Sequence, residues 1–210
     1  MGGLVGLQNG GTISGVSLSI SVQGGNLVGG LVGLNNGAIV SSSSTGAVNG
    51  AVEVGGLVGQ NWGEISDSYA TGHVKGAFYV GGLVGFNAGS VSNSYATGAV
   101  QNNTGVVSVA MRGGLVGEVN TAQFIDSYWN STANPSFDVT TGGVAGRVSA
   151  TSGVTALSTA AMKSASGYSS SFGNTSGAFT AASGWGFAGG VNGGFPVLCA
   201  ISNCTSYSNS

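Results

Sequence analysis

The chain contains 210 residues, of which 42 are glycine and only 5% are charged, with four Lys or Arg, six Asp or Glu, one His and a net charge of −2. Four cationic side chains do not make the basic surface that binds nucleic acid, so no nucleic-acid partner is expected. The ionisable groups are too few and too scattered to predict an acid–base or metal centre, and no cofactor is expected.

A short motif, GGLVG, recurs through most of the chain and defines a repeat. It begins at Gly2, Gly29, Gly55, Gly81 and Gly113, with a degenerate GGVAG at Gly142, so the intervals are 27, 26, 26, 32 and 29 residues. Because the chain begins inside a repeat, we expect it to be part of a longer protein whose earlier portion carries any targeting signal. No apolar run of about 18 residues predicts a transmembrane helix.

Each repeat contains three short apolar runs separated by turn residues. In the second repeat these are the LVG run, the run at Ile39 and the run ending at Val54, with turn signals at Asn35 and Thr45. Such short runs between Gly and Asn predict β-strands. One repeat cannot bury its own apolar face, so successive repeats must stack. Stacking makes two apolar columns: Leu4, Leu31, Leu57, Leu83 and Leu115, and Val5, Val32, Val58, Val84 and Val116.

The predicted fold is all-β, a right-handed parallel β-helix (solenoid) of about six coils with a C-terminal cap. The near-gapless repeat favours stacking over a propeller or a sandwich of antiparallel strands. Turn side chains at Asn35, Asn61 and Asn87 should pair along the stack, and glycine should serve at positive φ and where corners crowd. We assign residues 1–141 to the coils, 142–198 to a last imperfect coil and cap, and 199–210 to a C-terminal hairpin or tail.

Two segments lengthen the later repeats. Residues 101–112 and 121–141 are predicted to protrude as loops, where binding residues are usually placed. Within the cap, residues 156–166 have a helix-like composition. A solenoid must cover its terminal edge, so we expect three aromatic residues to plug the end: Trp185, Phe187 and Phe195.

The pattern GGLVGxNxGxI…SYATGxV, clearest at 55–74 and 81–100, is similar to the GLUG motif of large bacterial surface and secreted proteins. The tail, from SYWN at 127–130 through LSTAAMK at 157–163 to GGFPVL at 193–198, resembles the segment that closes such arrays. The resemblance implies an exoprotein of the filamentous-haemagglutinin-like, two-partner-secretion kind, or an autotransporter-like adhesin, at the bacterial cell surface and with a role in virulence. Such arrays also lie beside the catalytic domain of immunoglobulin-A-cleaving metallopeptidases, but that chemistry requires HExxH and His73 is the only histidine.

Cys199 and Cys204 enclose four residues near the C-terminus, and cysteines so close in a secreted chain suggest a disulfide. One interpretation is a local staple, although even a loop of about 15 residues contributes only about 3 kcal/mol. The resemblance offers another, because some two-partner exoproteins end in a short disulfide hairpin that lodges in the outer-membrane transporter. Free thiols or metal ligands are the third interpretation.

Aromatic residues recur at equivalent places in the repeats. Three of them are candidate ligand contacts, because a flat ring can stack on a glycan: Trp62, Tyr79 and Trp129. Three others, in the SYATG position or its equivalent, are expected to fill the core at one corner: Tyr69, Tyr95 and Tyr128.

Two further patterns suggest different functions. Thr45, Thr71 and Thr97 form one column, and flat Thr arrays on β-helices can order ice-like water; a regular lattice would need paired threonines, whereas each coil offers one. Glu64 and Asp67 fall in one coil and would be the carboxylates of a polysaccharide-processing enzyme, but no basic partner accompanies them, which favours solvated surface charge.

These observations predict a protein without enzymatic activity, the structural and adhesive stalk of a bacterial secreted surface exoprotein. Its expected partners are the two-partner-secretion transporter of the outer membrane, reached through a Cys199–Cys204 hairpin, and a host-cell or glycan receptor that the sequence does not identify. The alternatives are an ice-binding β-solenoid and a β-helical polysaccharide-processing enzyme.

Overall fold

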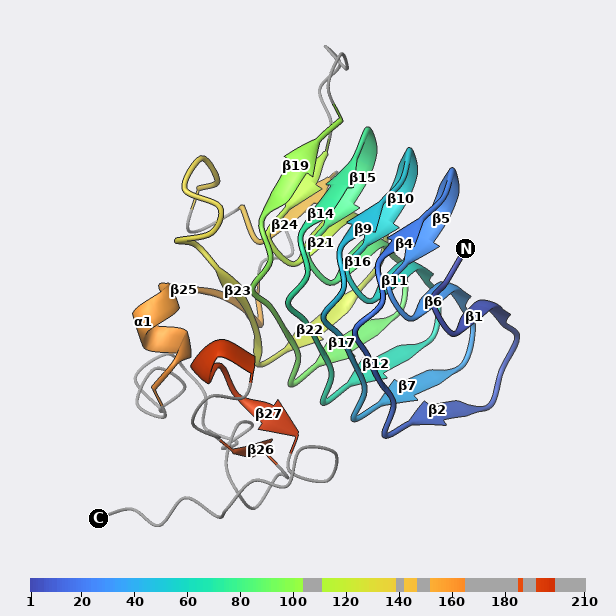
Figure 1. Cartoon of the computed structure of the whole chain (residues 1–210), viewed down its shortest axis with the longest axis horizontal. Helices are drawn as coiled ribbons and strands as arrows, with labels where there is room; N and C mark the ends of the chain where they lie inside the picture. Colours follow the sequence, from blue (N-terminus) through green and yellow to red (C-terminus); the bar gives the residue numbers. More distant parts are fainter. Residues whose placement is uncertain (104–110, 139–141, 147–151, 165–184, 187–191, 199–210) are drawn as a thin grey trace.

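In the computed structural model the chain winds into a stack of short parallel strands (Figure 1). The structure describes residues 1–103, 111–138, 142–146, 152–164, 185–186 and 192–198. Five parallel sheets run along the stack, and each full turn contributes one strand to every sheet. The predicted all-β parallel solenoid is therefore confirmed. It makes about five turns, and β24 (Val144–Gly146) and β25 (Val154–Leu157) begin another.

The sheets are numbered here in the order in which the chain enters them. The first, which carries the GGLVG motifs, contains β1 (Val5–Gln8), β6 (Val32–Asn35), β11 (Val58–Asn61), β16 (Val84–Asn87), β21 (Val116–Val119) and β24. The second contains β2 (Thr12–Ser14), β7 (Ala38–Val40), β12 (Glu64–Ser66), β17 (Ser90–Ser92) and β22 (Gln123–Ile125). The third contains β3 (Ser17–Leu18), β8 (Ser43–Ser44), β13 (Tyr69–Ala70), β18 (Tyr95–Ala96), β23 (Ser127–Asn130) and β25.

The two remaining sheets close each turn. The fourth contains β4 (Val22–Gln23), β9 (Val48–Asn49), β14 (Val74–Gly76) and β19 (Val100–Asn102). The fifth contains β5 (Asn26–Gly29), β10 (Val52–Gly55), β15 (Phe78–Gly81) and β20 (Arg112–Gly113). A turn thus has five strands where the sequence predicted three. The strands of the third and fourth sheets are two to four residues long and mostly lack an apolar run, so the pattern of hydrophobic residues did not reveal them.

Strands pair in the register of the repeat. Val58 lies opposite Val32 on one side and Val84 on the other, as the stacked columns predict. The leucine column packs beside these valines in the main core and is fully buried from Leu31 onward. Leu4, in the first of these turns, is 47% exposed.

A second core separates the fourth and fifth sheets and consists of valine. Buried side chains of this size each stabilise the fold by about 1.5–3 kcal/mol relative to exposure. The cluster follows the axis through four turns: Val22, Val28, Val48, Val54, Val74, Val80 and Val100. With so few charged residues, apolar burial and the backbone ladders between turns account for most of the cohesion of the stack.

The asparagine column forms a ladder inside the solenoid. The side-chain amide of Asn35 donates to the amide oxygen of Asn61 at 2.7 Å, and Asn61 donates in turn to Asn87 at 2.7 Å. All three side chains are buried. The predicted pairing of turn asparagines along the stack is confirmed, and it satisfies polar groups that would otherwise be costly to bury.

Positive φ angles in the turns fall mostly on residues other than glycine. At the corner before the third sheet, the left-handed residues are Gly15, Ser41, Asp67, Asn93 and Asp126, with φ of 68°, 48°, 49°, 47° and 44°. Short polar side chains tolerate this conformation. The motif glycines are needed for close approach instead: a Cβ atom at Gly56 would stand 2.1 Å from the carbonyl oxygen of Gly82 in the next turn.

The lengthened repeats keep more of the coil than predicted. Within the expected loop at 121–141, residues 123–130 supply β22 and β23, which pair with the previous turn through Phe124 and Tyr128. The described part that leaves the coil is the turn at 131–138. In the segment 101–112, the ends join β19 and β20, and residues 104–110 lie outside the described residues.

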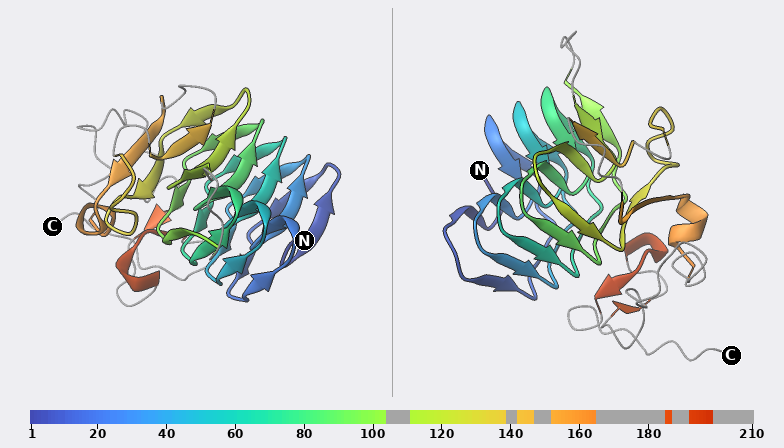
Figure 2. Two further views of the ribbon diagram at one scale, coloured as in Figure 1. Left: turned by 90° about the horizontal axis from the view of Figure 1, so that it is seen from above. Right: turned by 180° about the vertical axis from the view of Figure 1, so that it is seen from behind.

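The C-terminal elements lie beside the third sheet rather than across the end of the stack (Figures 1 and 2). Residues 154–157 are strand. Within the described part of the predicted helix-like segment 156–166, α-helix covers only α1 (Thr159–Met162). β26 (Trp185–Gly186) pairs antiparallel with β27 (Val197–Leu198). None of the helices in the described ranges is long and apolar enough to cross a membrane.

The expected aromatic plug is therefore arranged differently. Trp185 and Phe195 pack against tyrosines on the outer side of the third sheet. The interior of the last full turn is filled by Trp129, which takes the place of the small Ala96 one turn earlier, with Phe137 packed against it at 6.2 Å between ring centroids. Phe187 lies outside the described residues.

Candidate functional site

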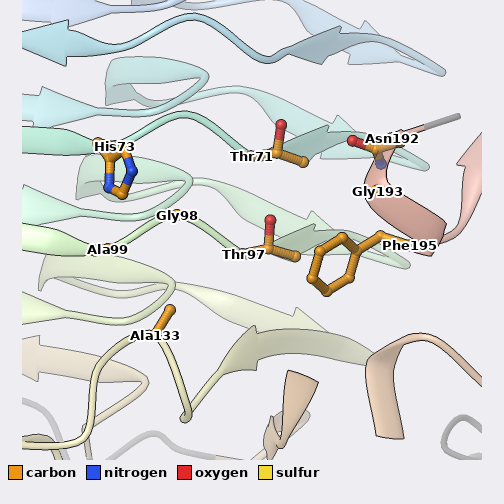
Figure 3. A pocket seen from close by; sticks show the side chains of 9 residues that line it. All are labelled: Thr71, His73, Thr97, Gly98, Ala99, Ala133, Asn192, Gly193 and Phe195. Carbon is orange, nitrogen blue, oxygen red and sulfur yellow. The ribbon is translucent and has the colours of Figure 1, made fainter. Parts of the chain in front are cut away.

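A groove of about 610 Å³ lies between the side of the solenoid and the C-terminal turn at Asn192–Gly194. Figure 3 shows the residues that line it, from three successive turns of the solenoid on one side and from the C-terminal segment on the other. Those that offer polar or aromatic groups are Thr71, His73, Thr97, Asn192 and Phe195. Its volume lies within the range of about 300–1,000 Å³ that is typical of small-molecule sites.

The solenoid supplies one wall through equivalent positions of the repeat. Thr71 follows β13 and Thr97 follows β18, so the two hydroxyls belong to turns about 4.8 Å apart. Figure 3 shows both hydroxyls pointing to the same side. Neither hydroxyl has a hydrogen-bond partner among the described residues, so both remain available. His73, two residues beyond Thr71, is exposed.

The opposite wall is a sharp left-handed turn. Asn192, Gly193 and Gly194 all have positive φ, at 49°, 61° and 87°. The Phe195 N–H donates to the Asn192 carbonyl at 3.2 Å and closes the turn. Such a conformation is accessible to glycine and tolerated by asparagine. It brings the Asn192 side chain and the Phe195 ring to the same groove.

The turn is attached to the repeat through Tyr95. The Asn192 side-chain amide donates to the Tyr95 hydroxyl at 2.8 Å and to the Pro196 carbonyl at 3.2 Å. The Tyr95 hydroxyl itself donates to the Pro196 carbonyl. The Tyr95 hydroxyl and the Pro196 oxygen are bonded to one another and lie on one side of the Asn192 nitrogen, so they share one amide hydrogen. The side-chain oxygen of Asn192 faces no donor from the described part of the chain. The groove is therefore held open by contacts that lie beneath it.

Three tyrosines form the floor under this segment. Tyr69 and Tyr95 stack with ring centroids 5.0 Å apart and planes 2° from parallel, and Trp185 lies 5.6 Å from the Tyr95 ring. Tyr128 lies opposite Tyr95 in the sheet and belongs to the same buried cluster. The rings are buried, as expected, but on the outer face of the third sheet, because Ala70 and Ala96 occupy the inward positions.

Burial also affects the ionisation of this floor. It raises the pKa of the Tyr69 hydroxyl above its ordinary value of 10.0, and a hydrogen bond with the Ser43 side chain offsets part of that rise. The Tyr69 hydroxyl therefore stays uncharged through the neutral pH range.

The three aromatic residues predicted to contact a ligand lie apart from the groove. Trp62 is 51% exposed and packs against Phe86, with ring centroids 5.8 Å apart. Tyr79 is half-buried in β15 at a φ of 52°. Trp129 is 1% exposed inside the last full turn, so its ring faces are covered by protein and cannot stack on a ligand.

The threonine column does not form a flat surface. Thr45 and Thr71 are half-buried, whereas Thr97 is only 8% exposed. Asn192 and Phe195 stand over the column. A surface that orders water over a lattice has to be open along several turns. Here two of the three threonines, Thr71 and Thr97, face the C-terminal segment across the groove.

The two carboxylates considered for catalysis, Glu64 and Asp67, lie in the same strand-and-turn segment, β12 and the corner that follows it. Glu64 is exposed in β12, and Asp67 takes a left-handed corner position. Neither forms an ion pair with a described residue. Within the described ranges, no group of three His, Cys, Asp or Glu side chains is placed to hold a metal ion. Cys199 and Cys204 lie outside the described residues.

The sequence pattern does not predict that these residues line one groove. Thr71 and Thr97 were noticed as a column, His73 only as the sole histidine, and Phe195 as part of a cap. The spacing of the repeat does place Thr71, His73 and Thr97 together on one corner. Nothing in the sequence indicates that Asn192 folds back over them, because it is 95 residues from Thr97 in the chain.

Comparison with known proteins identifies the repeat. The GLUG motif matches residues 50–75 and 76–101, which span the third and fourth turns and include Thr71, His73 and Thr97. No curated protein and no solved structure matches the chain significantly.

Proposed function

We propose that this chain is a structural and adhesive module without enzymatic activity, the stiff stalk of a bacterial secreted surface exoprotein. One observation carries the proposal: consecutive turns pair in an unbroken register along the axis, and a buried asparagine ladder follows the same axis. Bending or sliding one turn against the next breaks backbone pairs and buried side-chain bonds together. A rod held in this way presents a binding surface at a distance from its attachment point.

The GLUG matches support the same conclusion at the level of a structural repeat protein. The composition adds to it, because a chain with only 5% charged residues suits contact with neutral surfaces better than charge-driven binding. Few Lys and Arg residues also leave few cleavage sites for trypsin-like proteases outside the cell.

Adhesion is tested by coating fluorescent beads with the full chain and counting the beads retained on epithelial monolayers under flow. Beads coated with heat-unfolded protein are the control for non-specific retention. We expect several-fold more retention with the folded chain. Equal retention of the two preparations overturns the adhesive part of the proposal. Rapid digestion of the folded coils by subtilisin overturns the proposal that they form a stiff stalk.

We further propose that Cys199 and Cys204 form a hairpin that holds the protein in its outer-membrane transporter. The support is their spacing near the C-terminus and the resemblance to two-partner exoproteins. The test is the fraction of full-length protein that stays with the producing cells when Cys199→Ser, Cys204→Ser or the neighbouring Ser202→Ala is introduced. We expect both cysteine variants to be released into the medium and the Ser202→Ala variant to stay with the cells. Equal retention of all three excludes the anchor.

A further inference from the structure

We propose that the groove between the Thr71–Thr97 corner and the Asn192–Phe195 turn binds a neutral saccharide. The inference rests on the adhesive function proposed above and gives it a ligand class. It is carried by unused hydrogen-bonding groups and an aromatic ring that converge on one uncharged cavity.

The polar groups of the groove match a polyol. Thr71 and Thr97 each offer a hydroxyl that both donates and accepts, and the two are one strand spacing, about 4.8 Å, apart. Asn192 adds an amide oxygen across the groove, and its amide nitrogen bonds to Tyr95 and Pro196 beneath it. Sugar hydroxyls, which donate and accept at successive ring positions, can bond to such a set without any ionic partner.

Phe195 supplies an apolar face. Its ring lines the groove, and the Lys163 ammonium lies 4.9 Å from the ring centroid. Lys163 is not among the residues that line the groove. A ring that presents one side to a cavity can pack against the C–H face of a pyranose, while the hydroxyls at the ring edge meet the polar wall.

The charge of the groove argues for a neutral ligand. None of its lining residues is Asp, Glu, Lys or Arg. A sialic or uronic acid would lose part of its hydration there without meeting a Lys or Arg of the lining. A neutral saccharide loses only hydroxyl–water bonds, which the threonine hydroxyls and the asparagine oxygen replace.

The geometry of the groove is held before any ligand enters. Asn192 is fixed by the Tyr95 hydroxyl, and Tyr95 is fixed by stacking on Tyr69. Non-glycine residues in the left-handed region persist where the surroundings determine them, and such residues concentrate at binding sites. A preformed groove lowers the ordering cost of binding.

His73 provides a built-in reporter, because it is the only histidine of the chain and it lines the groove. We would record the ¹H–¹³C signal of its Cε1–H group while adding cellobiose, lactose or N,N′-diacetylchitobiose to the full chain, up to about 20 mM, since weak single-site binding falls in the millimolar range. At least one of the three saccharides should shift the signal with saturation.

Two variants and a control test the assignment. Phe195→Ala should weaken binding at least tenfold by removing the stacking face. Thr97→Val, which keeps the shape and removes the hydroxyl, should weaken it several-fold. Phe78→Ala removes an exposed ring outside the groove and should leave the titration unchanged. Near-ultraviolet circular dichroism from Trp185, buried beside Tyr95, shows whether each variant keeps the C-terminal segment in place.

The proposal is overturned if none of the three saccharides shifts the His73 signal, or if a folded Phe195→Ala variant binds as well as the wild type. Bead adhesion separates this failure from failure of the proposed function. Beads that still adhere while the His73 signal stays constant leave the adhesive role in place and assign it to another surface. Beads that do not adhere overturn the adhesive role itself.

Discussion

Gly59, near the start of the third turn, packs directly against the backbone of Leu27 at the end of the first turn, so that a Cβ atom at Gly59 would stand 2.6 Å from the Leu27 carbonyl carbon. Leu27 has a φ of 53°, and the equivalent residues Glu53 and Tyr79 repeat this left-handed geometry at 55° and 52°. The unusual backbone of the fifth sheet and the third glycine of each GGLVG motif therefore fit one another. The contact explains why that position is glycine even where φ does not require it.

Gly59→Ala should destabilise the protein by about 3 kcal/mol or more, because two backbone groups within 2.7 Å leave no room for a methyl group. The chain contains its own control. Gly6 holds the same place in the first turn, and a methyl group added there would have no other atom within 4 Å. Gly6→Ala should therefore be neutral or stabilise by about 0.4–1 kcal/mol. Urea unfolding midpoints measure both, and equal effects would contradict the packing argument.

The asparagine ladder gives a second prediction. Asn61→Ala removes the acceptor of Asn35 and the donor to Asn87 in the dry interior, and should cost about 2–4 kcal/mol because it leaves two buried groups unpaired. Asn36, which follows Asn35 in the chain, is exposed, and Asn36→Ala should change the free energy of unfolding by no more than about 0.5 kcal/mol. Chemical denaturation is the measurement. Similar losses for Asn61 and Asn36 would mean that the ladder contributes no specific stability.

The sequence predicted the fold because the repeat fixes the register. Once Val58 is placed over Val32, every residue 26 positions apart follows, including the asparagine ladder. The sequence did not predict the position of the C-terminal segment, because no repeat constrains the chain there. The position of Trp185 on the outer tyrosine stack depends on contacts between residues about 90 to 116 apart in the chain, which no local pattern encodes.

The two walls of the groove show the same contrast. The repeat-borne wall, Thr71 and Thr97, was visible as a column, although as a surface for ice. The other wall depends on the bond between Asn192 and Tyr95. A side-chain hydrogen bond between two residues of common type leaves no signature in a single sequence, so the covered groove was out of reach before the structure.

Tyr95→Phe should loosen the C-terminal segment without unfolding the coils. The substitution keeps the stacked ring and removes the hydroxyl that bonds to Asn192 and Pro196, a local loss of about 1–3 kcal/mol. Hydrogen exchange should accelerate at residues 192–198 while β11 and β16 stay protected. Tyr79→Phe, in β15 and away from this segment, is the matched control. Unchanged exchange at 192–198 in the Tyr95 variant would show that apolar packing alone holds the segment.

Glu53 predicts a dependence of stability on pH. Its side chain lies in the fifth sheet between Leu27 and Tyr79 of the neighbouring turns, and desolvation by burial raises its pKa above the ordinary value of 4.5. The folded state therefore holds this proton more tightly than the unfolded state does. Stability from this group is greatest below pH 4.5 and falls as the pH rises through the raised pKa.

Glu53→Gln should remove that penalty. The thermal midpoint of the variant should exceed that of the wild type at pH 7.5 and match it more closely at pH 4, where the wild-type carboxyl is protonated. The difference between the two pH values is the measured quantity, which cancels any constant effect of the substitution on packing. A midpoint lowered at pH 7.5 would show that the carboxylate forms favourable contacts there instead.

Tryptophan fluorescence tests where the three indoles lie. Trp62 is 51% exposed, whereas Trp129 and Trp185 are each 1% exposed. Trp62→Phe should therefore remove most of the emission that iodide quenches and shift the remaining spectrum to shorter wavelength. Stability should separate the same residues: Trp129→Ala empties the interior of the last full turn and should cost about 3–5 kcal/mol, whereas Trp62→Ala should stay within about 0.5 kcal/mol. Persistent iodide quenching in the Trp62→Phe variant would mean that Trp129 or Trp185 is accessible, and an accessible Trp129 would restore it as a ligand contact. A cost for Trp62→Ala as large as that for Trp129→Ala would instead place the indole of Trp62 in the packing of the coil, with Phe86 as its partner.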